Sequence, residues 1–153
     1  MKKPVNQILV IFGASGDLTK RKLIPALYDL YLQNLLPEKF AVLGASRTAL
    51  SDDDFREKAD EFLPEEKQVE AFKKMLFYEP ISPKEAGDFE KLKSRLEKLG
   101  KSNSIAANYI FYLSTPPSVY GTISKNLSEA ELSKSDKYFR RLIVEKPFGT
   151  DLD

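Results

Sequence analysis

Residues 8–23, ILVIFGASGDLTKRKL, constrain the fold more than any other part of the sequence. An apolar run leads without a break into Gly13 and Gly16, and a basic segment with helical spacing follows at once. This order predicts a buried strand, a tight turn with bare backbone amides, and the N-terminus of a helix. Because helix N-termini carry unpaired N–H groups and partial positive charge, the turn is expected to face an anion such as a phosphate.

Strands and helices are expected to alternate along the whole chain. Runs with strand composition occupy residues 7–12, 40–45, 75–78, 105–113 and 140–144. Stretches with helical spacing of apolar residues lie between them, at residues 18–35, 51–63, 65–74, 82–100 and 119–127. This alternation predicts an α/β fold: a Rossmann-like, doubly wound parallel sheet of about five or six strands with helices on both faces.

Several helix ends carry local signals. Pro37 is expected to stop the first helix, and Ser51 is expected to cap the second. Ser82 and Pro83 are typical of an N-cap followed by proline at the first helical position. Gly100 is placed to end the helix that they open.

Composition restricts the classes of function. The 153 residues have a net charge of +1, with 42% hydrophobic and 31% charged residues, which is typical of one soluble domain without a basic field for nucleic acid. No apolar stretch approaches the length of a membrane helix, and the N-terminus does not resemble a signal peptide. The absence of cysteine excludes disulfides and thiolate metal sites, which fits a cytoplasmic protein.

The sequence also contains no histidine. Histidine is the commonest general base and the commonest metal ligand in proteins. Any catalysis by this chain alone would therefore depend on Lys, Tyr, Asp or Glu. Acidic residues are plentiful, but none cluster at metal-ligand spacing, so no metal site is expected.

The glycine turn favours a phosphate site, although two glycines also suit a purely structural turn. Thr19 stands where the usual dinucleotide-binding fingerprint has a third glycine. Lys20, Arg21 and Lys22 would oppose the helix dipole unless an anion lies nearby. Helical spacing sends these three side chains in different directions, so either one or two reach the ligand or all form a solvated face. Asp17 either caps the helix or marks the pocket.

The second predicted strand leads into Ser46, Arg47 and Thr48. In dinucleotide-binding folds this strand end meets the adenosine ribose, where an acid binds the 2′-hydroxyl of NAD and a cation binds the 2′-phosphate of NADP. The sequence has no acid there, so Arg47 predicts a preference for NADP. The competing interpretation is an arginine that only contacts solvent.

Two further strand ends carry candidate residues. Residues 114–117, STPP, follow the fourth strand at the carboxyl edge where such sheets bind ligands, although the prolines also suit a simple strand end. Tyr120 then either flanks a nicotinamide or packs in the core. Residues 145–149, EKPFG, leave the fifth strand at the same edge, and in isolation they indicate a turn whose Lys146–Pro147 bond is open to either isomer.

Together these segments resemble the coenzyme domain of the glucose-6-phosphate dehydrogenases. The resemblance rests on GASGDL at residues 13–18 with its basic run, on Arg47, on FYLSTPP at residues 111–117 with Tyr120, and on IVEKPFG at residues 143–149. It covers the chain from the first strand to its end. The pairing of GASGDL with EKPFG is far more specific than either motif alone.

The resemblance implies a role for individual residues. NADP would be the cofactor, its pyrophosphate held by the glycine turn and its 2′-phosphate paired with Arg47. Lys146 would lie between the coenzyme and the sugar substrate, Lys22 would face the same pocket, and Pro147 would couple the positions of the two ligands. The implied cofactor-binding residues are Gly13, Ala14, Ser15, Gly16, Asp17, Leu18, Thr19, Lys20, Arg47, Tyr120 and Lys146.

The family oxidises glucose 6-phosphate to 6-phosphogluconolactone with reduction of NADP, the first oxidative step of the pentose phosphate pathway. Its general base is a histidine and its sugar phosphate is bound by a second domain, and both would lie beyond Asp153. We therefore expect residues 1–153 to be one NADP-binding domain of a longer enzyme, with no catalytic residue of its own. Such a piece is expected to bind coenzyme as a monomer without catalysing the reaction, whereas the full-length enzyme would be a homodimer or tetramer.

Three other classes share parts of this pattern. Short-chain dehydrogenases and sugar-nucleotide epimerases use a Tyr-x-x-x-Lys pair, and no tyrosine here has a lysine four residues later. A receiver-type signalling domain would need an acidic pocket at the strand ends, where this chain is basic. A stand-alone NADP-sensing module remains the alternative, although the lysine of EKPFG has no obvious role in sensing.

Overall fold

The computed structural model describes residues 3–144, and its centre is a sheet of parallel strands. The strands are β1 (Gln7–Phe12), β2 (Phe40–Ser46), β3 (Leu76–Pro80), β4 (Tyr109–Leu113) and β5 (Arg140–Val144). Their order across the sheet is β3-β2-β1-β4-β5, and every neighbouring pair is parallel. The predicted Rossmann-like fold is therefore confirmed, with five strands in the described part of the chain.

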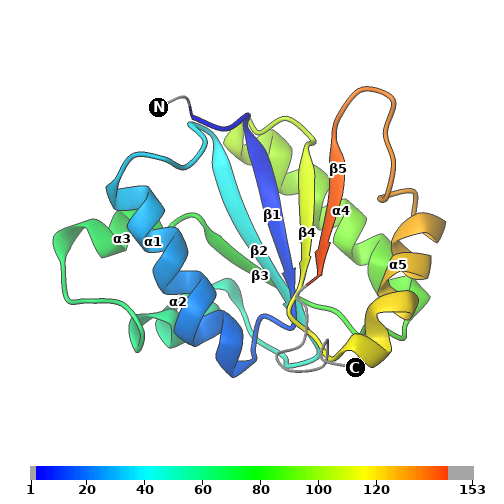
Figure 1. Cartoon of the computed structure of the whole chain (residues 1–153), viewed down its shortest axis with the longest axis horizontal. Coiled ribbons are helices and arrows are strands. Elements are labelled where there is room, and N and C mark those ends of the chain that lie inside the picture. The colour runs from blue at the N-terminus through cyan, green and yellow to red at the C-terminus, as the bar shows by residue number, and fades with distance from the viewer. Residues whose placement is uncertain (1–2, 145–153) are drawn as a thin grey trace, which may run out of the picture.

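Helices cover both faces of this sheet, as Figure 1 shows. One layer holds a π-helical turn (Thr19–Leu23) that continues as α1 (Ile24–Leu32), with α2 (Asp52–Asp60) and α3 (Lys67–Lys73). The other layer holds α4 (Ala86–Asn103) and, after a 3-10 turn (Pro117–Val119), α5 (Tyr120–Glu129). The alternating side chains of β1 supply both layers, because Ile8, Val10 and Phe12 pack in the core under α4 and α5 while Ile11 packs in the core under α1.

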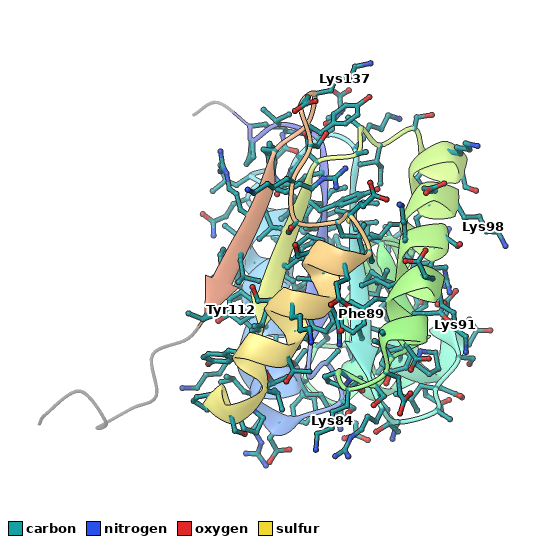
Figure 2. All side chains as sticks on the ribbon, turned by 90° about the vertical axis from the view of Figure 1, so that its right-hand side faces the viewer. Lys84, Phe89, Lys91, Lys98, Tyr112 and Lys137 are labelled. Atoms are coloured by element: carbon teal, nitrogen blue, oxygen red, sulfur yellow. The ribbon has the colours of Figure 1, made fainter. Side chains whose placement is uncertain are left out.

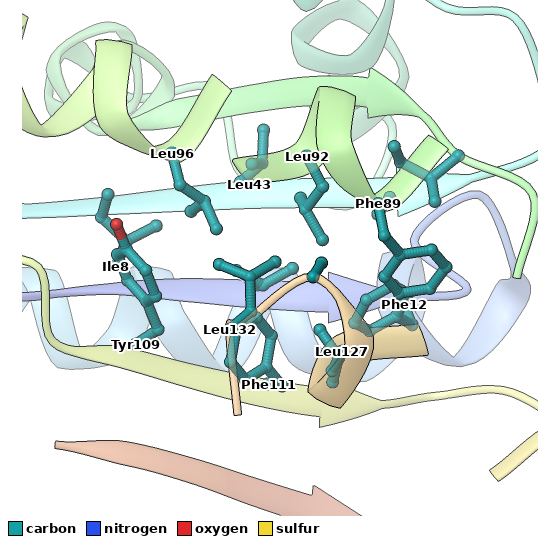
Figure 3. Packing of buried hydrophobic residues seen from close by; sticks show 14 of the residues in the cluster. Ile8, Phe12, Leu43, Phe89, Leu92, Leu96, Tyr109, Phe111, Leu127 and Leu132 are labelled. Atoms are coloured by element: carbon teal, nitrogen blue, oxygen red, sulfur yellow. The ribbon is translucent and has the colours of Figure 1, made fainter. Parts of the chain in front are cut away.

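Aromatic packing fixes the end of β1. Phe12 is buried and stacks on Phe89 of α4, with ring centroids 5.8 Å apart, and it also contacts Phe111 of β4 at 6.4 Å (Figure 3). These contacts immediately precede Gly13. The turn after β1 therefore starts from a rigid position in the core.

Four predicted helix ends behave differently from one another. The Ser51 cap is confirmed: its side chain accepts from the Asp54 N–H, and the Asp54 carboxylate accepts from the Ser51 N–H. Hydrogen bonds of the carboxylate with Ser51, first of all that from the backbone N–H, lower the pKa of Asp54. The prediction for Ser82 and Pro83 is wrong. The Ser82 N–H bonds to the Asp88 carboxylate, residues 82–85 form a turn, and α4 starts only at Ala86.

The other two corrections concern helix C-termini. Gly100 does not end α4, which continues to Asn103 and ends where Ser104 adopts a φ of 55°. The first helix ends at Leu32, well before Pro37, because Asn34 takes a left-handed φ of 60°. The fourth strand also starts later than predicted, at Tyr109, because Ile105 packs in the core without joining the sheet ladder.

The path of the chain reverses at β1. From β1 it proceeds outward through β2 and β3, and it then returns to place β4 on the opposite side of β1. The loops that follow β1 and β4 therefore leave the sheet in different directions, which opens a crevice at the carboxyl edge.

Candidate functional site

A cleft of about 450 Å³ lies at this carboxyl edge. The loops that follow β1, β2, β3 and β4 all contribute to it. Its lining residues are Gly13, Ser15, Gly16, Ser46, Arg47, Thr48, Ser82, Pro83, Lys84, Ser114, Thr115, Pro116 and Val119. No acidic side chain is among these described residues, so the charge of the cleft comes from Arg47 and Lys84.

The turn after β1 requires glycine at Gly13. This residue has a φ of +82°, and its N–H donates to the Ala45 carbonyl over 2.8 Å. A Cβ atom there would lie 2.3 Å from the Ser114 carbonyl oxygen and 3.1 Å from a Thr115 methyl carbon. Gly16 closes the turn, since its N–H donates to the Gly13 carbonyl over 3.0 Å. The backbone is thus free of side chains where a phosphate group would approach it.

Of the other residues in and after the turn, some are buried against the sheet and others face the cleft. Ala14 is buried, and its Cβ would be only 2.8 Å from a Cβ added to Gly44 of β2. Thr19, at the third glycine position, is fully buried and its hydroxyl donates to the Gly13 carbonyl over 3.3 Å. Both residues hold the turn against the sheet. Of this set, Ser15 lines the cleft.

The basic run lies beside the cleft rather than in its lining. Lys20, Arg21 and Lys22 belong to the π-helical turn, and none of them is among the described lining residues. Asp17 is exposed and pairs with Arg21 at 3.9 Å, and the helix N-cap is Leu18, whose side chain makes no capping bond. The capping interpretation of Asp17 is therefore wrong.

Hydroxyl groups connect the turn to the loop after β2. The Ser15 hydroxyl accepts from the Ser46 hydroxyl at 2.9 Å and from the Thr48 hydroxyl at 3.2 Å. The buried Tyr78 hydroxyl contacts the Ser46 hydroxyl and donates to the Thr48 carbonyl over 2.7 Å. Burial raises the pKa of Tyr78, an effect that the Ser46 hydrogen bond opposes, so the phenol stays protonated at neutral pH.

Arg47 lies between the two anchored residues of this loop. Its side chain is exposed, lines the cleft and forms no ion pair within the described part of the chain. Ser46 and Thr48 are its neighbours in the chain, and Ser15 lines the same cleft. The arrangement suits a dianionic group, because Arg47 supplies a positive charge among polar hydroxyl groups and the described lining residues include no competing carboxylate.

The end of β4 supplies the opposite wall. Ser114 and Thr115 line the cleft, and the hydroxyl oxygens of both are buried without a hydrogen-bond partner among residues 3–144. The predicted position of residues 114–117 at the ligand-binding edge thus matches the geometry. Tyr120 starts α5 and is half-buried against the core under that helix, outside the described lining.

Comparison with known proteins identifies the family. Residues 10–153 match the family described as "Glucose-6-phosphate dehydrogenase, NAD binding domain". The chain belongs to the glucose-6-phosphate dehydrogenase family. The predicted family is therefore confirmed, and the fold is that of the NAD-binding domain of this family.

Relatives of known sequence match almost all of the chain. The glucose-6-phosphate 1-dehydrogenase of Aggregatibacter actinomycetemcomitans is 47% identical over 154 residues, which cover 97% of this chain and 31% of the relative. That of Treponema pallidum is 42% identical over 95% of this chain and 30% of its own length. The chain thus spans about a third of the length of the glucose-6-phosphate dehydrogenases that it matches.

Solved structures give the same result. A glucose-6-phosphate dehydrogenase in complex with its substrate glucose-6-phosphate superposes with a TM-score of 0.85 at 33% identity, over 97% of this chain and 32% of that one. The enzyme from Mycobacterium avium superposes with a TM-score of 0.77 at 26% identity, over 94% of this chain and 30% of that one. The likeness to the family therefore extends from the motifs to the whole described fold.

The structure brings only some of the predicted site residues of this glucose-6-phosphate dehydrogenase domain together at the cleft. Of the cofactor-binding set, Gly13, Ser15, Gly16 and Arg47 line the cleft together. Lys146 and Pro147 lie outside the described residues, so their roles stay predictions.

Sequence reasoning missed the contribution of residues 82–84 to the cleft. A signal for it existed, since the third parallel strand must end at the same edge as the other strands. Within residues 3–144, no helix is long and apolar enough to cross a membrane and no group of side chains could hold a metal ion.

Proposed function

We propose that this chain is the NADP-binding part of an enzyme that oxidises glucose 6-phosphate to 6-phosphogluconolactone. The observation that carries the proposal is the cleft itself, in which a side-chain-free glycine turn and Arg47 face one space without a carboxylate. An NAD-specific site would place an acid at the end of β2, where this chain has Ser46, Arg47 and Thr48.

The residues fit NADP in a defined way. The pyrophosphate would approach the backbone of the turn at Gly13 and Gly16, where no side chain stands in the way. Arg47 would pair with the 2′-phosphate, and the Ser46 and Thr48 hydroxyls would have to turn from Ser15 to donate to it. The chemistry that NADP supplies when bound is acceptance of a hydride from the sugar. In this proposal the described residues bind and orient the coenzyme and take no proton from the substrate.

Ligand titration tests the proposal. NADP and NAD are each titrated into the chain while the amide signals of Gly13, Gly16 and Arg47 are followed by NMR. Tighter binding of NADP with shifts at all three positions supports the proposal. We expect Arg47→Ala to weaken NADP about tenfold or more and NAD only slightly, because the lost charge-assisted contact concerns the 2′-phosphate alone. Equal losses for both coenzymes would show that Arg47 does not bind the 2′-phosphate.

An activity assay tests whether this chain binds the coenzyme without catalysing the reaction. With glucose 6-phosphate and NADP present, we expect no formation of NADPH by this chain, because it has no histidine to act as the base. Turnover above the uncatalysed rate would contradict this part of the proposal. Failure of both coenzymes to bind would instead overturn the coenzyme site.

A further inference from the structure

The cleft has a second cationic side chain that the family motifs do not include. Lys84 lines it from the loop after β3, while Arg47 lines it from the loop after β2. We propose that Lys84 and Arg47 together bind the 2′-phosphate of the coenzyme, so that Lys84 is a specificity-determining residue. This inference rests on the proposed function, because only a coenzyme with a 2′-phosphate offers the pair an anion that NAD lacks.

The two loops leave the sheet side by side. Ser46 of β2 pairs in register with Pro80 of β3, and the strands are parallel, so both loops start at the same edge. The next residue after Pro80, Ile81, donates its N–H to the Ser46 carbonyl over 2.8 Å. Arg47 directly follows Ser46. The backbone that leads to Lys84 is therefore hydrogen-bonded to the backbone that carries Arg47.

Side chains from two helices hold the loop of Lys84 in place. The Asp88 carboxylate of α4 accepts from the Ser82 N–H at 2.8 Å. The Asn126 amide of α5, only 7% exposed, donates to the Pro83 carbonyl over 2.7 Å. These bonds fix both residues that precede Lys84. A cation on a fixed loop loses less conformational entropy when it binds an anion than a cation on a mobile one.

Lys84 differs from the neighbouring cations in having no described ion pair. Lys91 pairs with Asp88 at 3.7 Å, and Arg95 pairs with Asp52 at 2.7 Å and with Glu79 at 3.1 Å. Asp88 is thus occupied by Ser82 and Lys91, whereas the exposed Lys84 keeps its charge available at the cleft. Figure 2 shows Lys84 at the end of the molecule toward which the strands point, with Lys98 far along α4.

The test compares two pairs of ligands that differ by the phosphate. Calorimetry measures the Kd of NADP and NAD, and of 2′,5′-ADP and 5′-AMP, for the chain and for Lys84→Met, Lys84→Arg and the control Lys98→Met. We expect Lys84→Met to weaken NADP and 2′,5′-ADP by about two- to fivefold, the range of an exposed ion pair, and to leave NAD and 5′-AMP nearly unchanged. Lys84→Arg should retain the affinity, and Lys98→Met should match the unmodified chain.

Salt dependence gives a second readout. If Lys84 contacts the phosphate, the affinity of Lys84→Met for NADP should fall less steeply with salt than that of the unmodified chain. An NADP preference that persists unchanged in Lys84→Met would overturn this inference and leave the proposed function standing. If the unmodified chain binds neither NADP nor 2′,5′-ADP, the proposed function fails and this inference fails with it.

Discussion

Tyr78 acts on the candidate site from inside the sheet. Its hydroxyl donates to the Thr48 carbonyl and contacts the Ser46 hydroxyl, so it is bonded on both sides of Arg47. The ring is 1% exposed, and burial raises the pKa of Tyr78, which keeps the group a neutral donor. The position of Arg47 therefore depends on a hydroxyl that never reaches the cleft.

Removal of this hydroxyl should affect both stability and coenzyme preference. We expect Tyr78→Phe to lower the free energy of unfolding by about 1–3 kcal/mol, because the buried Ser46 hydroxyl and the Thr48 carbonyl lose a hydrogen-bond partner. The substitution should also shift Arg47, the proposed partner of the 2′-phosphate. The affinity for NADP should therefore fall, while the affinity for NAD, which has no 2′-phosphate, should change little. Urea unfolding and calorimetry measure the two effects.

Tyr31→Phe is the matched control for this substitution. Tyr31 lies on α1 and packs its ring against Tyr28 and Phe72, away from the cleft. It should leave the ratio of NADP to NAD affinity unchanged. The same ratio in Tyr78→Phe and in the unmodified chain would show that Tyr78 has no role in positioning Arg47.

The sequence allows prediction of some site residues and hides others for a physical reason. Gly13 and Arg47 are recognisable because each acts through its own short loop next to a strand. Tyr78 looks like an ordinary core aromatic, and its bond to Thr48 joins residues 30 positions apart. Lys84 escapes notice because the sequence there resembles a helix start, while Asp88 and Asn126 fold it into a turn.

At the scale of elements, side chains from two helices cover the outer edge of β3. Asp52 of α2 accepts from the Tyr78 N–H at 2.7 Å, and Arg56 donates to the Leu76 carbonyl over 2.8 Å. Arg95 of α4 donates to the Tyr78 carbonyl over 3.1 Å and to both carboxylate oxygens of Asp52. The Leu76 carbonyl and the Tyr78 N–H and carbonyl of this edge strand are thus hydrogen-bonded within the molecule and are not available for pairing with another strand.

Asp52 connects both helices to this edge. We expect Asp52→Ala to lower the free energy of unfolding by about 2–3 kcal/mol, because the Tyr78 N–H and the Arg95 guanidinium both lose an acceptor. Asp53→Ala is the matched control, since it removes a carboxylate from the same turn of α2. The Asp53 side chain is 94% exposed and, among the described residues, pairs only with Arg56 at 3.6 Å. Urea denaturation measures both variants. Equal losses would mean that the helix dipole, and not the edge contacts, accounts for the effect.

Element order could be predicted from the sequence better than element ends. Apolar periodicity reports which face of each helix is buried, so the α/β alternation and the parallel sheet follow from it. Helix ends depend on contacts made in the folded chain. The Ser51 cap involves only neighbouring residues and was predictable. The start of α4 depends instead on Asp88 inside that helix, whose carboxylate binds the Ser82 N–H, so that Ser82 does not cap the helix.

At the scale of the whole molecule, the two edges of the sheet are unlike. The β3 edge is covered by α2 and α4, whereas β5 pairs only with β4 among the described strands. Three consecutive apolar side chains of β5, Leu142, Ile143 and Val144, are 44%, 42% and 48% exposed. Since consecutive strand residues point to opposite faces, apolar surface is exposed on both sides of this edge.

The sequence predicts a monomer, but this open edge should make the chain self-associate as its concentration rises. A net charge of +1 gives little repulsion between copies, and an apolar edge strand offers both backbone hydrogen bonds and apolar surface to a second chain. We expect Ile143→Lys to lower this association, because a charge on an edge strand would be buried on pairing. Sedimentation velocity over a range of concentrations measures the effect.

Leu30→Lys on α1 is the control, since it adds the same charge at a side chain of similar exposure, 38%, away from the sheet edge. If both variants reduce association equally, net charge is the cause and the β5 edge is not the contact; if only Ile143→Lys does so, the contact is the β5 edge.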